Sequence, residues 1–113
     1  MNLQTEIQDG IVITKLEGNL LGETHYQPMV EMVQEQIGQG NKLFILDLEE
    51  LKYTNSTGLG GMITMLTKAR NSGGELILVN VPDMLKKLIQ MTKLDKIFTE
   101  ASSLEEAKAN LKA

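Results

Sequence analysis

Two adjacent hydroxyl residues, Ser56 and Thr57, are the strongest candidates for chemistry in this chain, and three of the next four residues are glycines, Gly58, Gly60 and Gly61. They join an apolar run, KLFILDL, to a second run with helical spacing. A hydroxyl at a helix start can cap a backbone N–H, for about 1 kcal/mol. The same position also tolerates a phosphate, because the positive end of the helix dipole lies there. Spacing alone leaves both roles open.

The rest of the sequence offers no recognisable catalytic or metal-binding set. His25 is the one histidine and there is no cysteine, so neither a zinc site nor a Ser-His-Asp triad is supported. The stretch GLGGM lacks the Gly-Lys-Ser/Thr ending of a phosphate-binding loop, and Ile63 stands where a dinucleotide fingerprint requires Gly or Ala. We therefore expect no cofactor, no metal and no enzymatic activity, and interpret His25 as an isolated surface residue.

Length and composition indicate one ordinary globular domain over residues 1–113. The net charge of −4 argues against a direct nucleic-acid partner. The first ten residues show no signal-peptide pattern, and no apolar run approaches the roughly 18 residues of a membrane span. We expect a cytoplasmic protein without a membrane span.

Apolar periodicity predicts strands alternating with helices after an initial hairpin, which indicates a mixed sheet covered by helices. Asp9-Gly10 is a two-residue hairpin turn signal between the first two strands. Pro28 is expected in the first turn of the first helix, which starts near Tyr26. The predicted strands cover residues 3–8, 11–18, 42–48, 75–81 and 96–100, and the predicted helices cover 26–37, 56–69, 82–89 and 103–112.

The chain resembles the STAS family, the sulfate-transporter and anti-sigma-factor-antagonist domains. The resemblance rests on the early LEGNL, the central NSTGLG, the strand GGELILVNV and the ending MTKLDKIF, and it covers essentially the whole chain. It is strongest to the free-standing bacterial anti-sigma factor antagonists. The resemblance implies an α/β fold: a single STAS domain with a mixed central β-sheet, an N-terminal hairpin and about four helices, packed mainly on one face.

The resemblance also implies a regulated binding function. In that family, an anti-sigma factor that is also a GHKL-type serine kinase phosphorylates a hydroxyl in an Asp-Ser-Ser/Thr-Gly-Leu-Gly motif. The unmodified antagonist binds the anti-sigma factor and frees the sigma factor; phosphorylation abolishes binding, and a PP2C-type phosphatase restores it. Matching the motif places the phosphoacceptor on Ser56, with Thr57, Gly58, Leu59 and Gly60 completing it.

Two positions depart from the family pattern. Asn55 replaces the acidic residue of the motif, and Leu21, in GNLLGE, lies where relatives often have an acidic residue. These departures bear on kinase recognition and on the identity of the partner. Some family members act without the switch, so the alternative function is a non-switched interaction subunit of a signalling scaffold or lipid-transport complex. A nucleotide-binding module is a weaker third possibility.

The expected binding surface combines residues 19–24, which include Asn19 and Leu21, with residues 54–61 and the exposed side of the following helix. Both segments should follow neighbouring strands, at the carboxyl ends where α/β sheets commonly place their sites. Leu21 has two possible roles. It is either an exposed apolar contact, or it packs into the core beside Leu20. The sequence leaves open which anti-sigma factor, sigma factor and signal are involved, and which oligomeric state the protein adopts.

Overall fold

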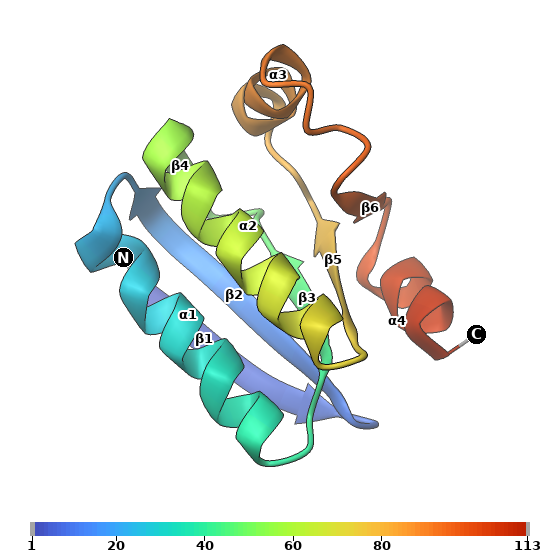
Figure 1. Ribbon diagram of the computed structural model, residues 1–113. Coiled ribbons are helices and arrows are strands. Elements are labelled where there is room, and N and C mark those ends of the chain that lie inside the picture. Colours follow the sequence, from blue (N-terminus) through green and yellow to red (C-terminus); the bar gives the residue numbers. More distant parts are fainter. Residues whose placement is uncertain (1, 113) are drawn as a thin grey trace.

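The computed structural model describes residues 2–112, which form a six-stranded mixed sheet with four helices (Figure 1). The strands follow the order β1-β2-β3-β5-β6, and β4 pairs separately with β2. Among the strand pairs within residues 2–112, only β1–β2 is antiparallel. This confirms the predicted fold class. The strands are β1 (Asn2–Gln8), β2 (Ile11–Leu20), β3 (Leu43–Asp47), β4 (Leu51–Thr54), β5 (Glu75–Val79) and β6 (Thr99–Ala101), and the helices are α1 (Glu23–Gly38), α2 (Ser56–Asn71), α3 (Asp83–Met91) and α4 (Leu104–Lys112).

The β1–β2 turn has the conformation that its dipeptide predicts. Asp9 and Gly10 both have positive φ, at 53° and 79°. A two-residue turn with both central residues in this region matches the right-handed twist of the strands it joins. The N-terminal hairpin is therefore confirmed, and it fixes β1 as the outer strand of the sheet.

The sheet separates two apolar cores, because successive side chains of a strand point to opposite faces. Val12 and Leu20 of β2 pack in the larger core with residues from α1, α2 and α3. Ile11 and Ile13 pack in the smaller core with Ala107 of α4. Figure 1 shows α1 and α2 lying side by side across the sheet, with α4 apart from them. Three helices thus share one core, as expected. No helix within residues 2–112 is long and apolar enough to cross a bilayer.

Strand β4 was not expected from the sequence, and it enters the sheet with an irregular register. Gly18 of β2 pairs with Leu51, but the next residue, Asn19, pairs with Tyr53, so Lys52 is an extra residue on β4. Such a bulge re-aims the side chains that follow it. Because of the extra residue, Leu51 and Tyr53 face opposite sides of the sheet: Leu51 points into the core, whereas Tyr53 is 65% exposed.

Several element boundaries differ from those predicted. β2 continues through Gly18, which has a φ of +98°, to Leu20, because β4 pairs with this extension. α1 begins three residues before Tyr26, so Pro28 lies in its second turn rather than its first. The missing N–H of Pro28 leaves one helical hydrogen bond unmade. β6 is shorter and lies further along the chain than the predicted strand over residues 96–100.

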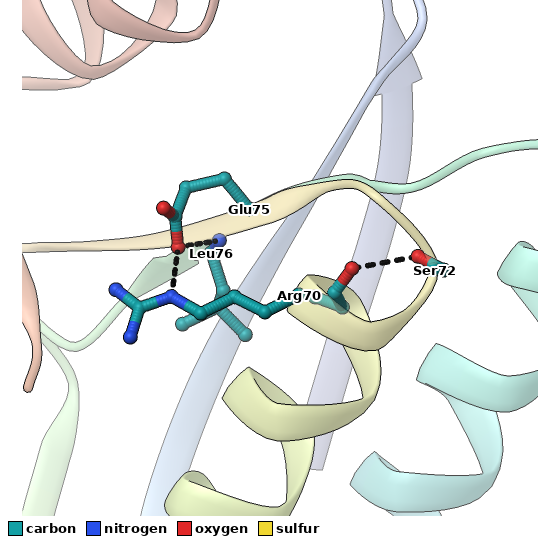
Figure 2. Close-up of polar contacts among 5 residues, drawn as sticks. Arg70, Ser72, Glu75 and Leu76 are labelled. Atoms are coloured by element: carbon teal, nitrogen blue, oxygen red, sulfur yellow. Dashed lines mark hydrogen bonds and ion pairs between the residues drawn. The ribbon is translucent and has the colours of Figure 1, made fainter.

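Polar contacts fix the junction between α2 and β5 (Figure 2). Glu75 Oε1 accepts from Arg70 Nε at 2.9 Å and from the backbone N–H of Leu76 at 3.0 Å. The Arg70–Glu75 pair is partly exposed, so we expect it to contribute about 1 kcal/mol or less. These contacts hold the carboxyl end of α2, which is the opposite end of the helix from Ser56.

Candidate functional site

Ser56 is the first residue of α2 and is exposed, in agreement with the predicted helix start. The residue that caps the helix is Asn55, whose Oδ1 accepts from the backbone N–H of Gly58 at 2.9 Å. Of the two roles that the spacing leaves open for Ser56 and Thr57, the structure therefore excludes the helix cap. Asn55 has the extended backbone of a cap residue, with a φ of −146°, whereas Ser56 is already helical.

The unexpected β4 strand is what joins the two segments of the expected surface. The Cα atom of Leu20, the last residue of β2, pairs with that of Thr54, the last residue of β4. Thr54 Oγ1 also donates to the Leu20 carbonyl at 2.8 Å. The two parallel strands therefore end together, and residues 19–24 lie beside residues 54–61.

Leu21 lies outside the core and is held at both of its backbone polar groups. Its side chain is 38% exposed, whereas Leu20 is fully buried. The Leu21 N–H donates to His25 Nδ1 at 3.0 Å, and the Leu21 carbonyl accepts from Asn55 Nδ2 at 2.9 Å. Of the two roles open to Leu21, the structure excludes packing into the core. His25 is partly buried and engaged, and is not the isolated surface residue that we expected.

Two glycines of α2 are required by close packing. A Cβ atom on Gly58 would lie 2.1 Å from the Leu20 carbonyl oxygen. A Cβ on Gly61 would lie 2.4 Å from Cγ of Tyr26 in α1. Both distances are far below van der Waals contact. Gly58 therefore lets the start of α2 pack against the end of β2, and Gly61 lets it pack against α1.

The remaining motif residues divide into exposed and buried positions. Leu59 is buried in the larger core, so it anchors α2 and is not available to a partner. Asn19 and Thr57 are exposed. A Cβ on Gly60 would meet nothing within 4 Å, and Gly60 follows Ser56 by one helical turn. The surface beside the Ser56 hydroxyl is therefore open.

Sequence reasoning missed two residues of this region. Tyr53 is the Cα partner of Asn19, so both side chains project from the same face of the β2–β4 pair. Tyr53 could have been noticed in the sequence as the one aromatic residue in the polar stretch before the motif. The direction of its side chain, however, depends on the β4 bulge. The role of His25 depends on its hydrogen bond with the backbone N–H of Leu21, four residues earlier, and no sequence pattern predicts that bond.

We predict that substituting the cap residue, Asn55, destabilises the protein much more than substituting the adjacent Ser56. Asn55→Ala should destabilise the protein by about 1–2 kcal/mol, because Gly58 N–H and the Leu21 carbonyl both lose their partner. Ser56→Ala should change the free energy of unfolding by less than about 0.5 kcal/mol, since the residue is exposed and does not cap. Urea unfolding of the two variants and the parent measures both values. A larger loss for Ser56→Ala than for Asn55→Ala would contradict the assignment of the cap.

Comparison with known proteins gives consistent matches over nearly the whole chain. The family model described as STAS domain matches residues 2–107. An anti-sigma F factor antagonist from Paenibacillus polymyxa is 31% identical over 101 residues, covering 86% of this chain and 85% of that protein. The solved structure of an anti-sigma factor antagonist from Mycobacterium paratuberculosis superposes with a TM-score of 0.83 at 18% identity, covering 99% of this chain and 94% of that one. The anti-sigma factor antagonist SpoIIAA in its unphosphorylated form has a TM-score of 0.74 at 21% identity, with 96% of each chain covered. The chain therefore belongs to the STAS domain family.

Proposed function

We propose that this chain is an anti-sigma factor antagonist whose binding is switched off by phosphorylation at Ser56. The observation that carries the proposal is the exposed Ser56 at the first position of α2, beside a cap that Asn55 supplies on its own. A kinase can modify such a hydroxyl without removing a structural hydrogen bond. Its setting in a STAS domain with an antagonist relative at 31% identity supports the same assignment. The protein acts by binding and needs no cofactor.

The surroundings of Ser56 suit a charge-operated switch. Residues 19–22 and 53–61 contain no charged side chain, and the exposed Glu23 and Lys52 border these two segments. A phosphate would add about −2 charge to the uncharged segment around Ser56, and the positive end of the α2 dipole would partly compensate it within the fold. The fold would thus tolerate the modification, whereas a partner surface matched to neutral groups would face an uncompensated charge.

The partners follow from this role. The unmodified protein binds an anti-sigma factor that is also a GHKL-type serine kinase, through residues 19–24, residues 54–61 and the exposed side of α2. A PP2C-type phosphatase returns the modified protein to the binding state. We further propose that residues 1–113 act as one STAS domain, in the cytoplasm and without direct contact to nucleic acid.

Phosphate mapping tests the acceptor directly. Incubation with ATP and the kinase should add a single phosphate, which peptide mass spectrometry should place on Ser56. Ser56→Ala should remain unmodified and still bind the anti-sigma factor, whereas the control Thr57→Ala should be modified like the parent. A phosphate on Thr57, or none with a kinase that is active on another substrate, would overturn the assignment. Equal binding by Ser56→Glu and the parent would favour the non-switched interaction subunit.

A further inference from the structure

We propose that His25 and Asn55 form a clamp on the Leu21 peptide, and that the clamped Leu21 is the apolar anchor by which this chain selects its anti-sigma factor. The inference rests on the proposed function and adds to it the kind of partner surface that fits. The matching factor presents an uncharged, apolar socket opposite Leu21. The clamp consists of the two hydrogen bonds at the Leu21 N–H and carbonyl groups.

Asn55 can do what a carboxylate at the same position cannot. Its Oδ1 accepts from the Gly58 N–H while its Nδ2 donates to the Leu21 carbonyl, both at 2.9 Å. An ionised aspartate could cap the helix, but it has no proton to donate and would place negative charge beside a carbonyl oxygen. The amide therefore ties the Leu21 loop to the start of α2, immediately before Ser56.

His25 closes the clamp from the other side. Its Nδ1 accepts from the Leu21 N–H at 3.0 Å, and it projects from the first turn of α1. The Leu21 peptide is thus held between the N-terminal turns of α1 and α2. Fixing a loop before binding reduces the ordering cost at the interface, which favours affinity. His25 is accordingly a positioning residue and not a contact.

The uncharged residues immediately around Leu21 determine the chemistry of the socket. Leu21 and Tyr53 are the two large exposed apolar side chains here, and Tyr53 flanks the surface from the end of β4. Residues 19–22 and 53–61 carry no charged side chain, and the exposed Glu23 and Lys52 lie at the edges of these two segments. A partner with a charged group directly opposite Leu21 would bury that charge against an apolar side chain, which is unfavourable. A partner with an apolar socket gains by burying both side chains.

Calorimetric titration with the GHKL-type anti-sigma factor encoded nearest to this chain tests the anchor. Leu21→Ala should weaken binding about tenfold while the melting temperature stays within about 2 °C of the parent. Leu21→Asp should weaken it further. The matched control is Ile97→Ala, because Ile97 is also 38% exposed but lies in the segment between α3 and β6. Ile97→Ala should bind like the parent.

Substitutions of His25 and Asn55 test the clamp, and hydrogen exchange of the Leu21 amide reports on it without a partner. His25→Ala should weaken binding about fivefold and speed hydrogen exchange of the Leu21 amide several-fold in NMR spectra. His25→Asn should restore both, because Asn Oδ1 can replace Nδ1 as the acceptor. Asn55→Asp should bind as weakly as His25→Ala although the helix remains capped.

Two patterns of results separate this proposal from the switch. If Ser56→Glu loses binding while Leu21→Ala and His25→Ala bind like the parent, the clamped anchor is wrong and the switch stands. If Ser56→Glu binds normally while Leu21→Ala does not, the anchor stands and the switch is wrong. Unchanged exchange of the Leu21 amide in His25→Ala would overturn the clamp in either case.

Discussion

Gly58→Ala should destabilise the protein by about 2–3 kcal/mol, whereas Gly60→Ala should stabilise it by about 0.5–1 kcal/mol. Both glycines lie in α2, where alanine has the higher helix propensity. At Gly58 the new methyl group would lie 2.1 Å from the Leu20 carbonyl oxygen, so backbone must move. At Gly60 the methyl group meets nothing within 4 Å, and only the propensity gain remains.

Urea unfolding of both variants checks this prediction, and each variant serves as the control of the other. The two substitutions make the same chemical change two residues apart in one helix, so helix propensity cancels in the comparison. We also expect Gly58→Ala to disturb residues 19–24, because its clash is with the last residue of β2. A Gly58→Ala variant as stable as Gly60→Ala would show that α2 can shift without cost and that the packing assigned to Gly58 is not needed.

Elements fixed by local sequence could be predicted well. The Asp9-Gly10 turn requires only two residues that accept positive φ. β5 and most of α2 follow from apolar patterns that fit one secondary structure each. Ser103, a residue type favoured at helix starts, caps α4: its Oγ accepts from the Glu106 N–H at 3.1 Å. In these cases the determining interactions lie within a few residues of each other.

The features that shape the candidate site depend instead on contacts between distant segments. β4 has four residues, too few to show a period, and its bulge arises from pairing with β2 more than 30 residues earlier. The Asn55–Leu21 bond likewise joins residues 34 positions apart. Gly58 and Gly60 look equivalent in the sequence, yet only Gly58 faces backbone from another element. The motif could be found from sequence, but the roles of its members could not.

A negative charge at Ser56 should lower affinity for the anti-sigma factor about hundredfold, and the same charge at Thr57 should lower it less than about tenfold. Burying an uncompensated charge in an interface costs several kcal/mol, which corresponds to at least this loss. Ser56 shares a helical side with the open Gly60, whereas Thr57 precedes Gly61 by one turn, on the side that packs against Tyr26 of α1. The partner should therefore cover Ser56 more completely than Thr57.

Ser56→Glu and Thr57→Glu make this comparison with matched charge, and the phosphorylated parent provides the reference. Both glutamates lie in the first turn of α2, where the dipole should stabilise the fold by about 0.3–1 kcal/mol, so lost binding would not reflect unfolding. The loss for Ser56→Glu should persist at 1 M salt, because screening acts weakly on a charge buried at the contact. Equal losses for the two variants that disappear in salt would instead indicate long-range repulsion over the whole surface, and a switch specific to Ser56 would then be untenable.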